Sequence, residues 1–290
     1  MGWQSGAGRV VVANGWVVRW GCAVATGGLL VTGCTSGDGK QAAPPPQARA
    51  TGSAAPSPSS AVDIDPGKLP TTAARATALI HDVIAQPAAF GPDTKSDTPY
   101  ESDPRKWAVL QKDCVWEQQA LPKGVLATLT RHYEVPAGGG KGPILLTAVV
   151  TTHRTAEQAD WENAEVLEEM MRCPSQLLRA GEVLSKLTDV PTALGDSGIT
   201  YADDVLTEMG EYTGDKVGGP HAYVWSQTRI GPFTVAVSAK GSKGWSRTDL
   251  FDRLRQPHAD MRARLAGAIE RDTAAAAPSA SASTTVKDSR

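Results

Sequence analysis

The spacing of apolar residues alternates along the chain between the helical period and the strand period. From residue 72 to 85 apolar side chains recur every three or four positions, which predicts a helix ended by Pro87. The segments 125–134 and 144–153 are rich in β-branched residues and are joined by a glycine-rich stretch, so we expect a hairpin. Helical spacing then returns and predicts a second helix over 155–173.

The same order of elements appears again further along the chain. We expect strands at 221–229 and 232–240, joined by a tight turn. A final helix is predicted to begin after Ser246 and to be broken or kinked at Pro257. Two units of hairpin followed by helix are typical of an α+β fold, an antiparallel sheet with helices packed on one face.

Three other segments of the central region have a weaker pattern. Residues 92–104 are polar and are expected to form a loop, while residues 107–119 fit either a helix or a strand. Residues 175–219 show no dominant period, so they receive no assignment.

Composition divides the chain into four parts. Residues 1–33 contain no acidic side chain and include an apolar stretch of roughly ten residues, which predicts an export signal peptide. Residues 34–70 are rich in Pro, Ala, Ser and Gly, and residues 273–290 in Ala, Ser and Thr, so we expect a disordered tether and a disordered tail. The remaining residues, 71–272, are enough for a single α+β domain with one core.

The predicted signal peptide ends at a cysteine that follows small residues. The run Leu-Val-Thr-Gly-Cys, ending at Cys34, resembles the lipobox of bacterial lipoproteins. The resemblance implies that Cys34 receives a diacylglyceryl group and becomes the first residue, so that acyl chains such as palmitate anchor the protein. We therefore expect a lipid-anchored protein on the extracytoplasmic face of the cell membrane. The alternative is that Cys34 is a chance cysteine in an ordinary secretory signal.

Charge and spacing exclude several classes of partner. The chain has 29 Lys and Arg against 31 Asp and Glu, a formal net charge of −2, so no basic surface for nucleic acid is expected. The five histidines are scattered and no phosphate-binding loop occurs, so we expect no metal and no cofactor. Five carboxylates of the predicted helix 155–173 are expected to face solvent: Glu157, Glu162, Glu165, Glu168 and Glu169.

Two cysteines, Cys114 and Cys173, lie within the predicted domain. An exported chain is in an oxidising compartment, where such a pair usually forms a disulfide. The alternative, a reactive or metal-binding thiol, lacks an adjacent base or further ligands.

Catalytic chemistry has a single candidate nucleophile. Ser197 lies in a Gly-Asp-Ser-Gly run that resembles the nucleophile segment of chymotrypsin-like proteases, with His132 or His153 as potential bases. That fold is all-β, whereas this chain predicts long helices, so we interpret the run as a turn and assign no catalytic residue. Five tryptophans are expected chiefly to fill the core, the alternative being a platform for a ligand: Trp107, Trp116, Trp161, Trp225 and Trp245.

One resemblance extends over about residues 100–270. The segment 155–161, Thr-Ala-Glu-Gln-Ala-Asp-Trp, begins a helix that ends at Met-Arg-Cys, with a hairpin and Cys114 before it. This pattern resembles the extracellular sensor domain of mycobacterial transmembrane serine/threonine kinases, a domain that also occurs on lipoproteins. The resemblance implies a non-catalytic domain with a cleft for an unidentified ligand. We therefore expect a membrane-anchored protein that is not an enzyme and binds an envelope ligand or a protein partner, the alternative being an envelope hydrolase that uses Ser197.

Overall fold

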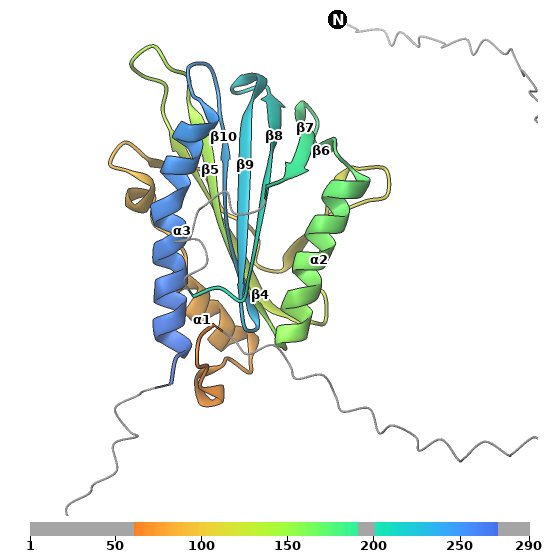
Figure 1. Ribbon diagram of the computed structural model, residues 1–290, viewed down its shortest axis with the longest axis vertical. Helices are drawn as coiled ribbons and strands as arrows, with labels where there is room; N and C mark the ends of the chain where they lie inside the picture. The colour runs from red at the N-terminus through yellow and green to blue at the C-terminus, as the bar shows by residue number, and fades with distance from the viewer. Residues whose placement is uncertain (1–60, 191–200, 272–290) are drawn as a thin grey trace, which may run out of the picture. The chain divides into compact units, whose positions relative to one another are not determined.

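An eight-stranded antiparallel sheet forms the centre of the protein (Figure 1). The computed structural model describes residues 61–190 and 201–271, which belong to one unit spanning Pro56–Arg290. The order across the sheet is β1-β4-β5-β10-β9-β8-β7-β6. Its strands are β1 (Lys95–Glu101), β4 (Val125–Val135), β5 (Ile144–His153), β6 (Gln176–Arg179), β7 (Glu182–Asp189), β8 (Asp204–Gly214), β9 (Gly218–Ile230) and β10 (Phe233–Lys240).

The remaining elements surround this sheet. Strands β2 (Lys106–Leu110) and β3 (Trp116–Ala120) pair with each other as a separate hairpin. The helices are α1 (Ala73–Val83), α2 (Ala156–Arg172) and α3 (Arg247–Ile269), with short 3-10 turns η1 (Pro66–Lys68) and η2 (Pro87–Phe90). Within the described ranges, none of these helices combines the length and the apolar character that crossing a membrane requires.

Both predicted units of hairpin and helix are present, and the α+β class is confirmed. Strands β4 and β5 pair antiparallel and lead into α2, and strands β9 and β10 pair antiparallel and lead into α3. The helix starts follow from side-chain caps: the Thr155 hydroxyl accepts a hydrogen bond from the Gln158 N–H at 3.2 Å. Ser246 and Asp249 form a reciprocal capping box at the start of α3. The helix α3 is continuous, with Pro257 inside it, so no break occurs there.

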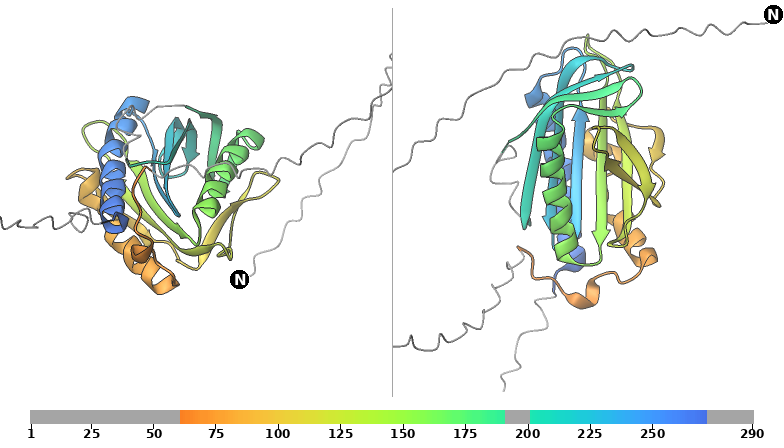
Figure 2. Two further views of the ribbon diagram at one scale, coloured as in Figure 1. Left: turned by 60° about the horizontal axis from the view of Figure 1, so that its bottom comes forward. Right: turned by 90° about the vertical axis from the view of Figure 1, so that its right-hand side faces the viewer.

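The sequence predicted that all helices pack on one face of the sheet, but they cover both faces. Helices α1 and α3 cover the face that carries the main apolar core, which includes Leu129, Val150, Val235, Leu254 and Met261. Helix α2 instead contacts β5, β7, β9 and β10 from the opposite face (Figure 2). The sheet curls, and its central strands have buried residues on both faces, so helices pack against each face.

Two expectations need correction, and two segments that the sequence left open can now be assigned. The segment 92–104 was expected to be a loop but contains the edge strand β1. An edge strand is partly solvated and can carry many polar side chains, so its sequence resembles that of a loop. The segment 107–119 supplies most of β2 and β3, and the unassigned segment 175–219 contains β6, β7 and β8. Residues 61–70, expected to belong to the tether, are part of the fold: Val62 is 3% exposed and packs in the main core.

Candidate functional site

A cavity of about 370 Å³ lies between the face of the sheet that α2 covers, the helix itself and the β2–β3 hairpin. Its size fits a small organic ligand. Most of its wall comes from seven strands of the curled sheet, so the curl of the sheet creates the cavity. Figure 2 shows α2 beside the open side of this curl.

Alternation along the strands places hydroxyl and imidazole groups on the cavity wall, while the core behind that wall stays apolar. On β4, Thr128, Thr130 and His132 line the cavity, whereas Leu129 and Tyr133 lie in the core. This is the two-residue period of a strand whose two faces have different environments.

Hydroxyl groups of neighbouring strands bond to each other across the cavity floor. The Thr128 and Thr151 hydroxyls lie 2.9 Å apart, and the Thr147 and Ser238 hydroxyls also form a hydrogen bond. These pairs satisfy one another, which allows a polar surface to be buried without bound water at each group.

Helix α2 contributes carboxylates to the cavity, which corrects the expectation that all five of its glutamates face solvent. Glu162, Glu165 and Glu169 line the cavity because positions separated by three and four residues share a helix face. Glu162 Oε2 lies 2.6 Å from His153 Nε2 and also accepts a hydrogen bond from the Thr234 hydroxyl at 2.9 Å. Glu162 therefore has hydrogen-bond partners within the protein.

Tryptophan side chains line the cavity more than they fill the core. Trp107 and Trp116 reach it from the β2–β3 hairpin, and Trp225 reaches it from β9. Trp245 packs at the edge of the main core, and Trp161 on α2 is 64% exposed. The expectation that the tryptophans chiefly fill the core is therefore wrong for most of them, although no ligand contact is shown.

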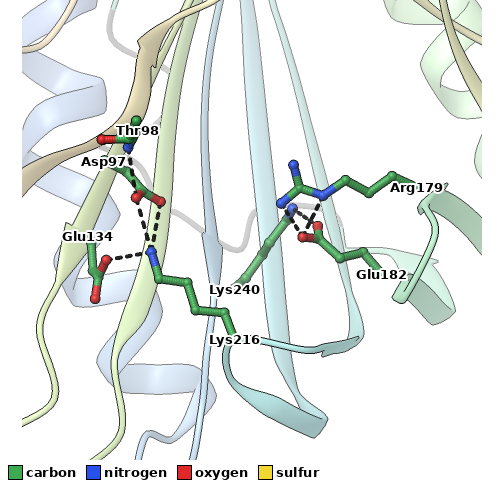
Figure 3. Close-up of polar contacts among 7 residues, drawn as sticks. All are labelled: Asp97, Thr98, Glu134, Arg179, Glu182, Lys216 and Lys240. Carbon is green, nitrogen blue, oxygen red and sulfur yellow. Dashed lines mark hydrogen bonds and ion pairs between the residues drawn. The ribbon is translucent and has the colours of Figure 1, made fainter. Parts of the chain in front are cut away.

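At one part of the cavity wall a cation is already paired. Lys240 lines the cavity, its Nζ lies 3.5 Å from Glu182 Oε2, and it sits 4.7 Å from the centre of the Tyr212 ring. Arg179 also pairs with Glu182, so two cations share this carboxylate (Figure 3). Burial lowers the pKa of Lys240, and Glu182 opposes that effect.

A separate ion-pair group connects distant parts of the curled sheet. Lys216, in the turn between β8 and β9, lies 3.0 Å from Asp97 on β1 and 2.6 Å from Glu134 on β4. Figure 3 shows Lys216 reaching both carboxylates. Because β5 and β10 separate these strands in the sheet order, the contact holds the curl closed.

One carboxyl group of the cavity wall, that of Glu208, lacks such pairing. Glu208 on β8 is 6% exposed, and within the described ranges no side chain is hydrogen-bonded or ion-paired to it. Burial, together with Glu169 and Asp189, raises the pKa of Glu208 to about 8. Burial and the neighbouring Glu165 raise the pKa of Glu169 to about 7.

The residues predicted as sites have different outcomes. Cys114 and Cys173 form the predicted disulfide, with their Cα atoms 5.5 Å apart, which links the β2–β3 hairpin to the end of α2. Cys34 and Ser197 lie outside the described residues, so lipidation and a serine nucleophile stay predictions. His132 lines the cavity, but His153 is paired with Glu162.

Several cavity residues were not singled out from sequence. Glu208 and Lys240 are charged residues within strands, and Tyr223 and Gln227 lie on β9 at the alternate positions that also hold Trp225. This alternation is visible in the sequence, but it does not show that the face is a cavity, because the opposing wall comes from distant segments. Among residues 61–190 and 201–271, no cluster of His, Cys, Asp or Glu is arranged to hold a metal ion.

The chain has weak similarity to two solved structures. The extracellular domain of PknH from Mycobacterium tuberculosis has 13% sequence identity and a TM-score of 0.43, over 69% of this chain and 98% of that chain. A putative uncharacterized protein from Mycobacterium smegmatis, an Rv0999 ortholog, has 15% identity and a TM-score of 0.30 over the same shares. No family model and no curated protein matches the chain. Because both similarities are weak, we infer function from the cavity itself.

Proposed function

We propose that this protein is a non-catalytic, sensor-like domain that binds a small ligand in the cavity beneath α2. The observation that carries this proposal is the partly open cavity of about 370 Å³, whose wall combines polar, charged and aromatic side chains. A cavity of this kind is a usual site for a small molecule, because it removes most of the ligand surface from water.

We further propose that the domain is held at the extracytoplasmic face of a membrane through a diacylglyceryl group on Cys34. The Cys114–Cys173 disulfide supports export, since such bonds persist in oxidising compartments. The lipobox-like run before Cys34 supports the anchor. Mass spectrometry of the protein from its membrane fraction tests the anchor: an unmodified Cys34 contradicts it.

The test of ligand binding is a thermal melt of the purified protein in the presence of wall fragments, glycans, lipids, amines and organic acids. A ligand at 100 times its dissociation constant stabilises a protein by about 2.7 kcal/mol. For a domain of this size the melting temperature should rise by roughly 5–11 °C.

A variant that fills the cavity shows whether binding occurs there. Val149 lines the cavity from β5, so Val149→Phe places a larger side chain in the ligand volume. Val183→Phe is the matched control, because Val183 on β7 is half-buried outside the cavity. We expect Val149→Phe to abolish the ligand-induced shift and Val183→Phe to retain it. A shift that survives in both variants contradicts the proposed site.

A further inference from the structure

We propose that the ligand of this cavity carries an organic cation, an amine or a quaternary ammonium group, which Glu208 and Glu169 bind. The inference rests on the proposed function, since it concerns the chemistry of the same cavity. Three features of the wall support it: an unpaired buried carboxylate, pairing of the nearby cation with another residue, and aromatic neighbours.

The unpaired carboxylate is Glu208. Its side chain lines the cavity and is 6% exposed, yet no described residue forms a hydrogen bond or an ion pair with it. Burying a carboxylate without a partner is costly, and native proteins usually supply a counter-charge. Glu169 faces the same volume from α2 and repels Glu208. A bound cation would relieve both the missing pairing and the repulsion.

The cations of the described cavity wall do not fill this role. Lys240 is paired with Glu182 and lies against the Tyr212 ring. Burial, Glu169 and Asp189 raise the pKa of Glu208, and no basic residue within the described ranges lowers it. Lys106, the exposed first residue of β2, also lines the cavity, but it is not among the groups that influence the pKa of Glu208. Within the described residues Glu208 therefore has no counter-charge.

Two aromatic side chains of β9 lie near the unpaired carboxylate. Trp225 on β9 lies directly opposite Glu208 in the register of β8 and β9, and both line the cavity. Tyr223 is buried, and burial together with the nearby Glu208 raises its pKa. Carboxylates combined with aromatic rings recognise organic cations through charge and through the negative face of the ring. A neutral or anionic ligand supplies no positive charge that would stabilise the ionised form of Glu208, whose pKa is raised to about 8 in the ligand-free protein.

An organic cation fits this wall better than a metal ion does. In the described part of the chain no group of three or more metal-ligating side chains converges, so the carboxylates of the cavity do not form a metal site. The aromatic neighbours also supply contact area for a carbon-bearing ligand, which a bare ion could not use.

The test uses probes that match in shape and differ in charge. Choline is compared with its neutral isostere 3,3-dimethylbutan-1-ol and with the anion 3,3-dimethylbutanoate, and putrescine is compared with butane-1,4-diol. Binding to the purified protein is measured by titration calorimetry at pH 8 in an amine-free buffer. We expect choline or putrescine to bind at millimolar concentration or better, and the neutral and anionic partners to bind at least about tenfold more weakly.

Two charge-neutralising variants locate the cation. Glu208→Gln keeps the shape of the side chain and removes its charge, so we expect a roughly ten- to hundredfold loss of affinity for the cationic probe. Glu211→Gln on the same strand is the control, since Glu211 pairs with Lys186 at 2.9 Å outside the cavity and should leave affinity unchanged. Glu169→Gln provides a second variant from α2.

The outcomes separate this inference from the proposed function. If a neutral or anionic ligand binds and Val149→Phe abolishes that binding, the cavity is a ligand site and the cation inference is wrong. If the cationic probes bind equally to wild type and Glu208→Gln, or do not bind at all, the inference is overturned. If no compound of any class shifts the melt in a way that depends on Val149, both proposals fail.

Discussion

Replacing Glu208 by Gln should make the ligand-free protein more stable at alkaline pH. Glu208 is 6% exposed and its pKa rises from the usual 4.5 to about 8. Between these values the folded state keeps its proton while the unfolded state has lost it, so the free energy of unfolding falls as pH rises. Above about pH 8 that loss is complete, and below 4.5 it is absent. The Glu208→Gln variant has no carboxyl group at this position, so it does not lose this part of its stability as pH rises.

The size of the effect follows from the difference in pKa. A rise from 4.5 to about 8 corresponds to a free energy on the order of 4–5 kcal/mol at full effect. Water in the cavity screens part of this free energy. We therefore expect the free energy of unfolding of Glu208→Gln to exceed that of wild type by about 2–4 kcal/mol at pH 8–9. The melting temperature should then exceed that of wild type by roughly 5–15 °C. The groups that face Glu208 are Glu169, Asp189 and Tyr223, and Glu169 retains its own pH dependence in the variant.

The assay is thermal unfolding followed by circular dichroism from pH 4.5 to 9 in amine-free buffers. The difference between variant and wild type should be near zero at pH 4.5 and should grow steadily towards pH 8. Glu211→Gln, which changes an ion-paired carboxylate outside the cavity, should follow the wild-type profile in shape. Parallel profiles for wild type and Glu208→Gln would refute the reasoning, because Glu208 would then be compensated in the folded state.

Three further predictions concern stability. Replacing Cys114 and Cys173 by Ser removes a disulfide between residues separated by 59 positions. The chain-entropy relation predicts that the free energy of unfolding falls by about 4 kcal/mol, which denaturant unfolding measures. Ser246→Ala removes the hydroxyl that accepts from the Asp249 N–H, so it should cost about 1 kcal/mol in the same assay, whereas an unchanged midpoint contradicts the capping box. Burial and the nearby Arg262 lower the pKa of His258 from 6.5 to about 3, so the folded state resists protonation and stability should fall between pH 6.5 and 3. His258→Gln should flatten that acid limb of the melting profile, and an equally steep limb in the variant would assign the loss to other groups.

The sequence predicts elements best where pattern and caps agree. The hairpin β4–β5 has a clear two-residue alternation, and α2 begins at the Thr155 cap and ends just before Pro174. Strand β8 escaped prediction because both of its faces are buried and it contains acidic residues, so its pattern resembles neither an amphipathic strand nor a core strand. Its place is set by pairing with β7 and β9, which a local period does not show.

The candidate site was predicted less well than the fold, for a related reason. The spacing of Glu162, Glu165 and Glu169 puts them on one helix face, but carboxylates on a helix normally face water, so that face was assigned to solvent. Helix α2 instead covers a cavity, and these three carboxylates line it, whereas Glu157 and Glu168 remain exposed. Only the curl of the sheet and the position of the β2–β3 hairpin show this, and both depend on contacts between distant segments.

The measurement that tests the central claim most directly is a crystal structure of the protein with the cationic probe that binds best. The account predicts density for the probe inside the cavity between α2 and β8, with its nitrogen within ion-pair distance of the Glu208 carboxylate and its carbon atoms against Trp225. Density for the probe at another surface, with the cavity holding only water, would contradict the claim that this cavity is the ligand site.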